Sequence, residues 1–287
     1  SVTGVQTCAL PICMVFSPDG NPIIGALPDQ PTAFVAAGCM AGFSQSGGVG
    51  LAVANWIVDG EPGMDVHAMD IARYGEFATR PYVLAKTAEN YRRRFIIPSP
   101  NEELQAARPH KISAIHDRLA ARGAVFGQVA GWEVPLWYAG RPEDAHETAS
   151  FRRSNAFEPI GAECEAVRNS VGLWETSSYC KIEIHGAEAA AWLDTVVANP
   201  VPALGRIGLA PLLTPSGRIL GDVSIMRITD DRLLLMGSPA AETTYLRWLR
   251  QHCVGGVDIS SVTNSYAGLS LTGPRARDPV LDRKSVV

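Results

Sequence analysis

The chain has 287 residues, of which 46% are hydrophobic and 19% charged, which is typical of a globular protein with about two domains. A formal net charge of −4 at pH 7 argues against a nucleic-acid-binding protein, which usually carries a basic excess. The apolar runs are too short to span a bilayer, so we expect neither nucleic acid nor membrane as a partner.

Both ends of the chain differ from the rest in their pattern. Residues 1–13, which begin SVTGVQTCALPI, show no period of two or of about 3.6 residues. Together with residues 283–287 (RKSVV) they resemble translated adapter DNA. We therefore predict that both segments are non-native and leave them out of the fold. The natural protein is then expected to extend beyond both ends.

The first part of the chain has the pattern of a strand, a glycine-rich loop and a helix. Residues 16–25 (FSPDGNPIIG) supply a Pro-Asp-Gly turn and the start of a strand, and Ala33–Ala37 is predicted as a short buried strand. A glycine-rich loop at residues 38–50 (GCMAGFSQSGGVG) then opens a helix, which the Asp-Gly-Glu-Pro run at 59–62 ends. The predicted apolar positions of this helix are Leu51, Ala54, Ile57 and Val58.

The middle of the chain is predicted to contain short helices separated by loops. Residues 101–108 (NEELQAAR) should form a helix ended by a proline, and residues 116–122 a second one. The polar run at residues 139–150 is the expected exposed loop. Apolar positions from Glu163 to Val171 have helical spacing, with Gly172 as the C-terminal cap.

The second half of the chain is predicted to be α+β with antiparallel pairing. Residues 181–185 (KIEIH) alternate as a half-buried strand, and residues 188–198 have helical spacing. Residues 218–228 and 232–236 form the two arms of a β-hairpin, and a helix follows at 242–252.

The glycine-rich segment Gly38–Gly50 is the first candidate for chemistry. It lacks the second glycine of a nucleophile elbow, the small residue of a dinucleotide fingerprint and the lysine of a P-loop. Backbone N–H donors at the start of a helix remain, and these suit an electron-rich ligand edge such as the pyrimidine side of a flavin. The alternative is tight packing, in which glycines only permit close backbone approach, and residue pattern alone favours it.

Asp222 is the second candidate. In the predicted strand it shares a face with Leu220, Ser224 and Met226, so burial beside apolar groups would make it a usable proton acceptor or cation stabiliser. The alternative is an edge-strand aspartate that faces water. The six histidines show no metal-ligand spacing, so no metal is expected.

Several stretches in consistent order resemble the dimethylglycine and sarcosine dehydrogenases. They are residues 16–25, 38–62, 72–86, 101–109, 131–138 and 150–161. Within the last stretch, Ala156 stands where an aromatic residue is usual, so local packing there is expected to differ. Residues 214–223 resemble the aminomethyltransferase segment whose acidic residue faces the reacting nitrogen of tetrahydrofolate, a role that the resemblance gives to Asp222.

The resemblance implies an α+β or α/β chain with three parts. Residues 14–63 would be the C-terminal end of a flavin-binding oxidoreductase domain, residues 64–112 its central domain, and residues 113–282 the first part of an aminomethyltransferase-like folate-binding domain. The resemblance also implies flavin contacts, against the tight-packing alternative. The residues implied are Gly25, Gly42, Phe43, Ser44, Gln45, Ser46, Gly47 and Gly48.

The implied enzyme is an FAD-dependent oxidoreductase that acts on a small N-methylated amino acid and passes the one-carbon unit to tetrahydrofolate. An electron-transfer flavoprotein is a possible electron acceptor, and the expected location is the bacterial cytoplasm or the mitochondrial matrix. The unit that binds the FAD diphosphate would lie upstream of Met14, so this chain alone should be inactive and bind FAD weakly or not at all. Two alternatives stay open: a folate-dependent aminomethyltransferase without oxidase activity, and a non-catalytic folate-binding module.

Overall fold

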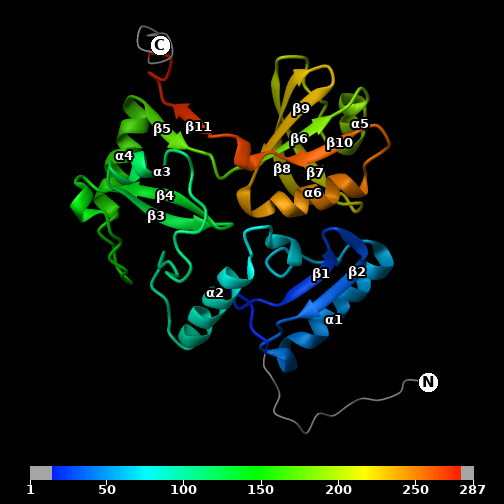
Figure 1. Cartoon of the computed structure of the whole chain (residues 1–287), viewed down its shortest axis with the longest axis horizontal. Helices are drawn as coiled ribbons and strands as arrows, with labels where there is room; N and C mark the ends of the chain where they lie inside the picture. Colours follow the sequence, from blue (N-terminus) through cyan, green and yellow to red (C-terminus); the bar gives the residue numbers. More distant parts are fainter. Residues whose placement is uncertain (1–14, 279–287) are drawn as a thin grey trace.

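Residues 15–278 are described by the computed structural model of the chain, and they form a mixed α/β structure with four separate sheets (Figure 1). The predictions for residues 1–13 and 283–287 lie outside the described residues. None of the helices within residues 15–278 has the length and apolar character needed to cross a membrane.

The N-terminal unit is a hairpin of β1 (Ile23–Leu27) and β2 (Gln30–Ala37) covered by α1 (Gly42–Asp59). Both predicted strands are confirmed, although β2 is only partly buried. Gly60 ends α1 in the left-handed conformation with φ of 80°, as the sequence predicts.

The start and the buried face of α1 differ from the prediction. The helix begins at Gly42, so most of the expected glycine-rich loop is helical. Its buried face consists of Val49 and Ala52, with Val53 and Trp56 beside them. The predicted apolar positions are exposed: they are Leu51, Ala54, Ile57 and Val58. Both faces carry apolar residues at helical spacing, so periodicity alone cannot choose between them.

The next segment consists of a short 3₁₀ helix, η1 (Ile71–Arg73), and α2 (Arg80–Arg93). The prediction of a helix at residues 101–108 is wrong, because the segment is irregular with a turn at its end, and side chains of α2 bind its backbone. Lys86 Nζ donates to the carbonyl oxygen of Leu104 at 2.8 Å, and the Glu89 carboxylate accepts the N–H groups of Gln105 and Ala106 at 2.9 and 2.7 Å.

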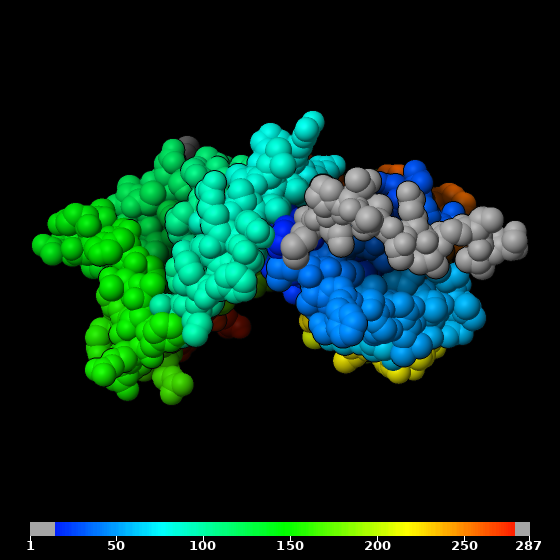
Figure 2. All heavy atoms as spheres, turned by 90° about the horizontal axis from the view of Figure 1, so that it is seen from below, coloured from blue at the N-terminus to red at the C-terminus, as the bar shows by residue number. Residues whose placement is uncertain are grey.

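A second unit contains α3 (His116–Ala120) and the antiparallel hairpin of β3 (Ala124–Val129) and β4 (Trp132–Tyr138). The mostly exposed loop predicted at residues 139–150 follows and includes the 3₁₀ helix η2 (Pro142–Asp144). Figure 2 shows from below that the segment around α2 lies between this unit and the N-terminal unit.

Helix α4 (Phe157–Asn169) and the two-stranded sheet of β5 (Gly172–Glu175) and β11 (Leu269–Thr272) complete this side of the molecule. The predicted cap at Gly172 is wrong: α4 ends at Asn169, and Gly172 is the first residue of β5. The helix also begins earlier than predicted and buries none of its side chains, so Cys164 and Val167 are exposed.

The largest sheet has five antiparallel strands in the order β10-β6-β9-β8-β7. Its strands are β6 (Cys180–His185), β7 (Ile207–Leu213), β8 (Ile219–Thr229), β9 (Arg232–Gly237) and β10 (Asp258–Ser261). The predicted hairpin is confirmed as β8 and β9. Strand β6 is buried over most of its length rather than half-buried, because it lies inside the sheet.

The main core lies between this sheet and the helices α5 (Ala189–Val196) and α6 (Glu242–Gln251), both of which the sequence predicts. A short 3₁₀ helix, η3 (Pro239–Ala241), leads from β9 into α6. In Figure 1, α6 lies between the five-stranded sheet and the N-terminal unit, and it contacts η1. Helix α6 is therefore an element through which the five-stranded sheet contacts the N-terminal part of the chain.

Candidate functional site

Asp222 lies on β8, an internal strand with β7 and β9 on either side, so it is not the edge-strand residue of the alternative prediction. Its neighbours Val223 and Ile225 are buried in the core, and strand alternation places Asp222 on the opposite face. Asp222 is exposed, which corrects the expectation that it is buried beside apolar groups; the alternative was right that the side chain faces water and wrong that its strand is at an edge.

The Asp222 side chain opens onto a cavity of about 300 Å³. The lining comes from β8, the end of β9 and the loop before β6, and consists of Tyr179, Asp222, Ser224, Met236, Gly237, Ser238 and Pro239. Within residues 15–278 no side chain forms a hydrogen bond or ion pair with the Asp222 carboxylate. The carboxylate is therefore available to a ligand in a cavity large enough for a small molecule.

Tyr245 of α6 supports the backbone of β8 and β9 from the core side. A Cβ on Gly237 would lie 2.8 Å from the Tyr245 ring, and a Cβ on Gly221 would also collide with it, so both positions need glycine. The Tyr245 hydroxyl donates to the carbonyl oxygen of Asp222 at 3.5 Å. Burial raises the pKa of Tyr245 to about 12, so this hydroxyl stays protonated at neutral pH.

Lys181 fixes the loop that brings Tyr179 to the cavity. Its buried ammonium group donates to the carbonyl oxygens of Thr176, Ser177 and Tyr179 at 3.3, 3.0 and 2.8 Å. Burial lowers the pKa of Lys181, but three carbonyl acceptors satisfy its three protons. The sequence did not predict the roles of Lys181 and Tyr245. For Tyr245, the available signal was the pair of glycines in neighbouring strands, Gly221 and Gly237.

A second, smaller cavity of about 100 Å³ lies at the junction of the units and shares Pro239 with the first. Lys111 lines it, with its ammonium group 4.4 Å from the centre of the Trp132 ring, and burial lowers the pKa of this lysine. On the α6 side, the Glu242 carboxylate accepts the hydroxyls of Ser261 and Thr263. Pro239 thus forms part of the wall of both cavities.

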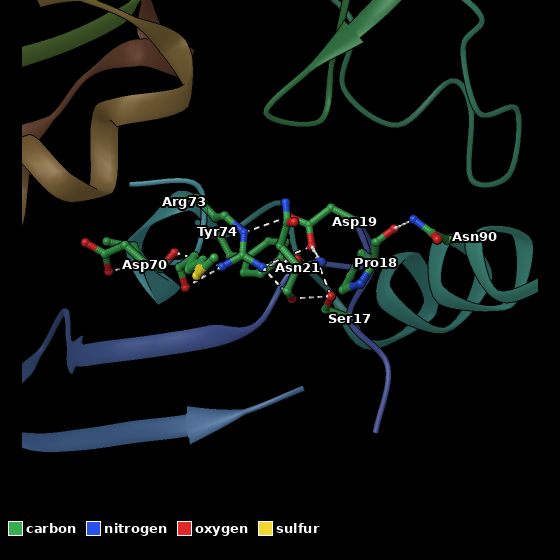
Figure 3. A network of polar contacts seen from close by, with 10 residues as sticks. Ser17, Pro18, Asp19, Asn21, Asp70, Arg73, Tyr74 and Asn90 are labelled. Atoms are coloured by element: carbon green, nitrogen blue, oxygen red, sulfur yellow. Dashed lines mark hydrogen bonds and ion pairs between the residues drawn. The ribbon is translucent and has the colours of Figure 1, made fainter. Parts of the chain in front are cut away.

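Arg73 also lines the junction cavity, and Figure 3 shows the polar network that holds it. Its guanidinium donates to Asp19 Oδ2 at 2.6 Å and to the carbonyl oxygen of Met69 at 2.8 Å. Asp19 belongs to the predicted Pro-Asp-Gly turn, which is confirmed by the φ of 79° at Gly20. Burial alone would raise the pKa of Asp19, but the hydrogen bond and charge of Arg73 lower it overall.

The predicted flavin-contacting glycines lie in the first turns of α1, which begins after Ala41 without a side-chain cap. A Cβ on Gly42, Gly47 or Gly48 would meet no atom within 4 Å. Tight packing within the described residues therefore does not explain these glycines, and Phe43 beside them is fully exposed. Their contact with a flavin stays a prediction, as it does for Ser44, Gln45 and Ser46.

Gly25 differs from the other predicted flavin contacts. It has a φ of 108°, and a Cβ there would lie 2.6 Å from the Trp56 ring and 3.3 Å from Asp70 Oδ1. Packing thus accounts for Gly25 without a ligand. Within residues 15–278 no group of three or more His, Cys, Asp or Glu side chains is placed to hold a metal ion.

Two family models match the chain. Residues 59–113 match the FAD dependent oxidoreductase central domain, and residues 115–284 match the GCVT N-terminal domain. The second match includes Asp222 and all five strands of the largest sheet.

Three curated proteins are similar to this chain along nearly its whole length. Dimethylglycine dehydrogenase, mitochondrial, of Homo sapiens is 34% identical over 92% of this chain and 31% of its own length. The pyruvate dehydrogenase phosphatase regulatory subunit, mitochondrial, of Mus musculus is 29% identical over 92% and 31%. Sarcosine dehydrogenase, mitochondrial, of Homo sapiens is 28% identical over 91% and 33%. The chain thus spans about a third of the length of these relatives.

Among solved structures, glycine cleavage system aminomethyltransferase T from Bartonella henselae is similar with a TM-score of 0.50. The identity is 21%, and the match covers 60% of this chain and 43% of that one. This likeness shows a shared fold and confirms the predicted aminomethyltransferase-like architecture.

Proposed function

Because the chain belongs to the GCVT N-terminal domain family and resembles dimethylglycine and sarcosine dehydrogenases over nearly its whole length, we propose that it forms the folate-binding part of an FAD-dependent N-methylamine dehydrogenase. The observation that carries the proposal is the cavity of about 300 Å³ into which Asp222 opens. The reaction proposed for the whole protein is oxidation of an N-methyl group, followed by transfer of the one-carbon unit to tetrahydrofolate.

The residues of the cavity fit tetrahydrofolate. When bound, tetrahydrofolate supplies the nitrogen that takes up the one-carbon unit. The free carboxylate of Asp222 would stabilise the positive charge that develops at that nitrogen. Ser224 and Ser238 offer hydroxyl groups for the polar edge of a pterin ring, and Met236 and Pro239 offer apolar surface for its face.

The residues at the start of α1 fit the edge of a flavin ring. The open space around Gly42, Gly47 and Gly48 allows a planar ring to approach the helix backbone, and the first N–H groups can donate to it. When bound, FAD accepts the hydride from the N-methyl group. The same proposal includes a small N-methylated amino acid as the substrate and an electron-transfer flavoprotein as the electron acceptor. It also includes a mitochondrial or cytoplasmic location.

The folate proposal is tested by titrating the purified chain with 5-formyl-tetrahydrofolate, a stable reduced folate, in a calorimeter. We expect saturable binding that weakens on the order of tenfold or more in Asp222→Asn, because a charge-assisted hydrogen bond is lost. Asp230→Asn is the matched control, since Asp230 is an exposed aspartate at the far end of the same hairpin. Equal affinity in Asp222→Asn and wild type, or no binding by wild type, contradicts the proposal.

A non-catalytic folate-binding module is the second candidate, because one relative of similar identity is named as a regulatory subunit. The full-length protein distinguishes the two. Methylene transfer from an N-methylated amino acid to tetrahydrofolate supports the dehydrogenase. Folate binding without amine oxidation supports the regulatory module.

A further inference from the structure

An ion pair joins the N-terminal unit to α6 at a point where both partners are buried. Arg247 Nη2 donates to Asp70 Oδ2 at 2.5 Å, and Nη1 donates to Asp70 Oδ1 at 2.9 Å. Nη1 also donates to the carbonyl oxygen of Ala26 at 3.0 Å. The side chains of Arg247 and Asp70 are only 7% and 6% exposed, so water screens the pair little.

Neighbouring residues hold the pair in one geometry. The Arg247 guanidinium lies 5.2 Å from the centre of the Trp56 ring of α1, and the glycine at position 25 leaves room for both Trp56 and Asp70. Asp70 also accepts the N–H of Ala72 at 2.9 Å. A planar, two-point contact of this kind fixes the orientation of the helix that carries the arginine.

Helix α6 in turn supports the folate cavity. Tyr245, two residues before Arg247, packs beneath Gly221, which precedes Asp222 in β8, and beneath Gly237 in the neighbouring strand β9. The segment that leads into α6 contains Ser238 and Pro239, which line the cavity. A rotation of α6 would therefore move the floor and one wall of the cavity together.

We propose that Arg247 and Asp70 are positioning residues for Asp222: their pair fixes α6, and α6 sets the shape of the cavity through Tyr245 and Pro239. The proposal rests on the proposed folate site. It assigns to the N-terminal unit a role in folate affinity that does not depend on flavin.

The test compares Arg247→Lys with Arg232→Lys in the purified chain. Lysine keeps the positive charge but loses the two-point contact. Arg232 pairs with Glu183 at 2.6 Å at the end of the hairpin remote from Asp222, so it is a matched control for losing a guanidinium pair. The measurements are the melting temperature, amide hydrogen exchange in α6 and β8, and the dissociation constant of 5-formyl-tetrahydrofolate well below the melting temperature.

We expect Arg247→Lys to raise the dissociation constant on the order of tenfold and to speed amide exchange in α6 and β8. Arg232→Lys should lower the melting temperature but leave the affinity within about twofold. Tyr245→Leu provides a second variant on the same route. Its effect on affinity should be less than additive with that of Arg247→Lys, since both act through α6.

Two outcomes separate this inference from the proposed function. If wild type binds and Arg247→Lys, still folded, binds equally well, the positioning role is overturned and the folate site stands. If wild type does not bind reduced folate at all, the proposed function fails, and the positioning role fails with it. Additive effects of Tyr245→Leu and Arg247→Lys would also overturn the proposed route through α6.

Discussion

The carboxylate of Asp19 pairs with Arg73, which is 54 residues away in the sequence, and this pair makes the stability of the fold depend on pH in acid. Asp19 accepts from Arg73 at 2.6 Å, and its pKa in the fold is lowered. The group therefore adds stability above its unfolded pKa, near 3.8, and this contribution is lost as the pH falls through the lowered pKa.

We expect Asp19→Asn to lower the free energy of unfolding by a constant amount above about pH 5 and by progressively less as the pH falls below 3.8. Urea unfolding at a series of pH values measures this difference. Asp230→Asn, whose side chain is 85% exposed, should show little change at any pH. A difference for Asp19→Asn that stays constant to pH 3 would contradict the expectation.

The roles of some single residues could be predicted from the sequence, and those of others could not. Resemblance pointed to Asp222, and the structure places it at a cavity, but alternation could not tell which face of β8 is covered. Tyr245 and Lys181 could not be predicted, because their roles come from contacts with other elements. The ring of Tyr245 packs beneath β8 and β9, and the ammonium group of Lys181 binds the carbonyl groups of a loop. Such contacts depend on how distant elements pack in the fold, and this packing cannot be inferred from a single sequence.

At the scale of elements, strands β6, β8 and β9 and helices α5 and α6 could be predicted, because alternation, turns and helical spacing agree there. Strands β7 and β10 of the same sheet were not predicted. The segment at residues 101–108 could not, because side chains of α2 satisfy its backbone groups in place of a helix. Helix α1 could be predicted, but its start and buried face could not, since glycines mark a loop in most sequences and both faces are apolar.

The glycines of α1 give a prediction that separates stability from ligand contact. Gly47 and Gly48 are helical, and a Cβ on either would meet nothing within 4 Å. Alanine at both positions should therefore stabilise the chain by roughly 1–2 kcal/mol, because it reduces the freedom of the unfolded chain. Differential scanning fluorimetry would show a rise of about 2–4 °C per kcal/mol.

A matched control for these substitutions is Gly60→Ala, which places a side chain at a φ of 80° and should destabilise α1. A fall in melting temperature for the Gly47→Ala, Gly48→Ala double variant would contradict the expectation. If a flavin contacts this face, the same double variant in the full-length protein should bind FAD less tightly while melting at a higher temperature.

At the scale of the whole molecule, the chain spans about a third of the length of its curated relatives, and the part proposed to face a flavin consists of one hairpin and one helix. We expect the chain as given to bind FAD weakly or not at all. Visible absorbance of the purified protein after incubation with FAD and gel filtration measures this. A stoichiometric oxidised flavin retained through the column would contradict the expectation.

The buried pair of Arg247 and Asp70 also affects when the contact between α6 and the N-terminal unit can form during synthesis. Its two residues are 177 positions apart, so during synthesis Asp70 leaves the ribosome long before its partner exists. At typical rates of 5–20 residues per second, the delay is roughly 10–35 s. Throughout that interval Asp70 has no arginine to pair with, so burial of its carboxylate has to wait for Arg247. The contact between α6 and the N-terminal unit is thus a late one in the synthesis of this segment, although its two residues end as a buried pair.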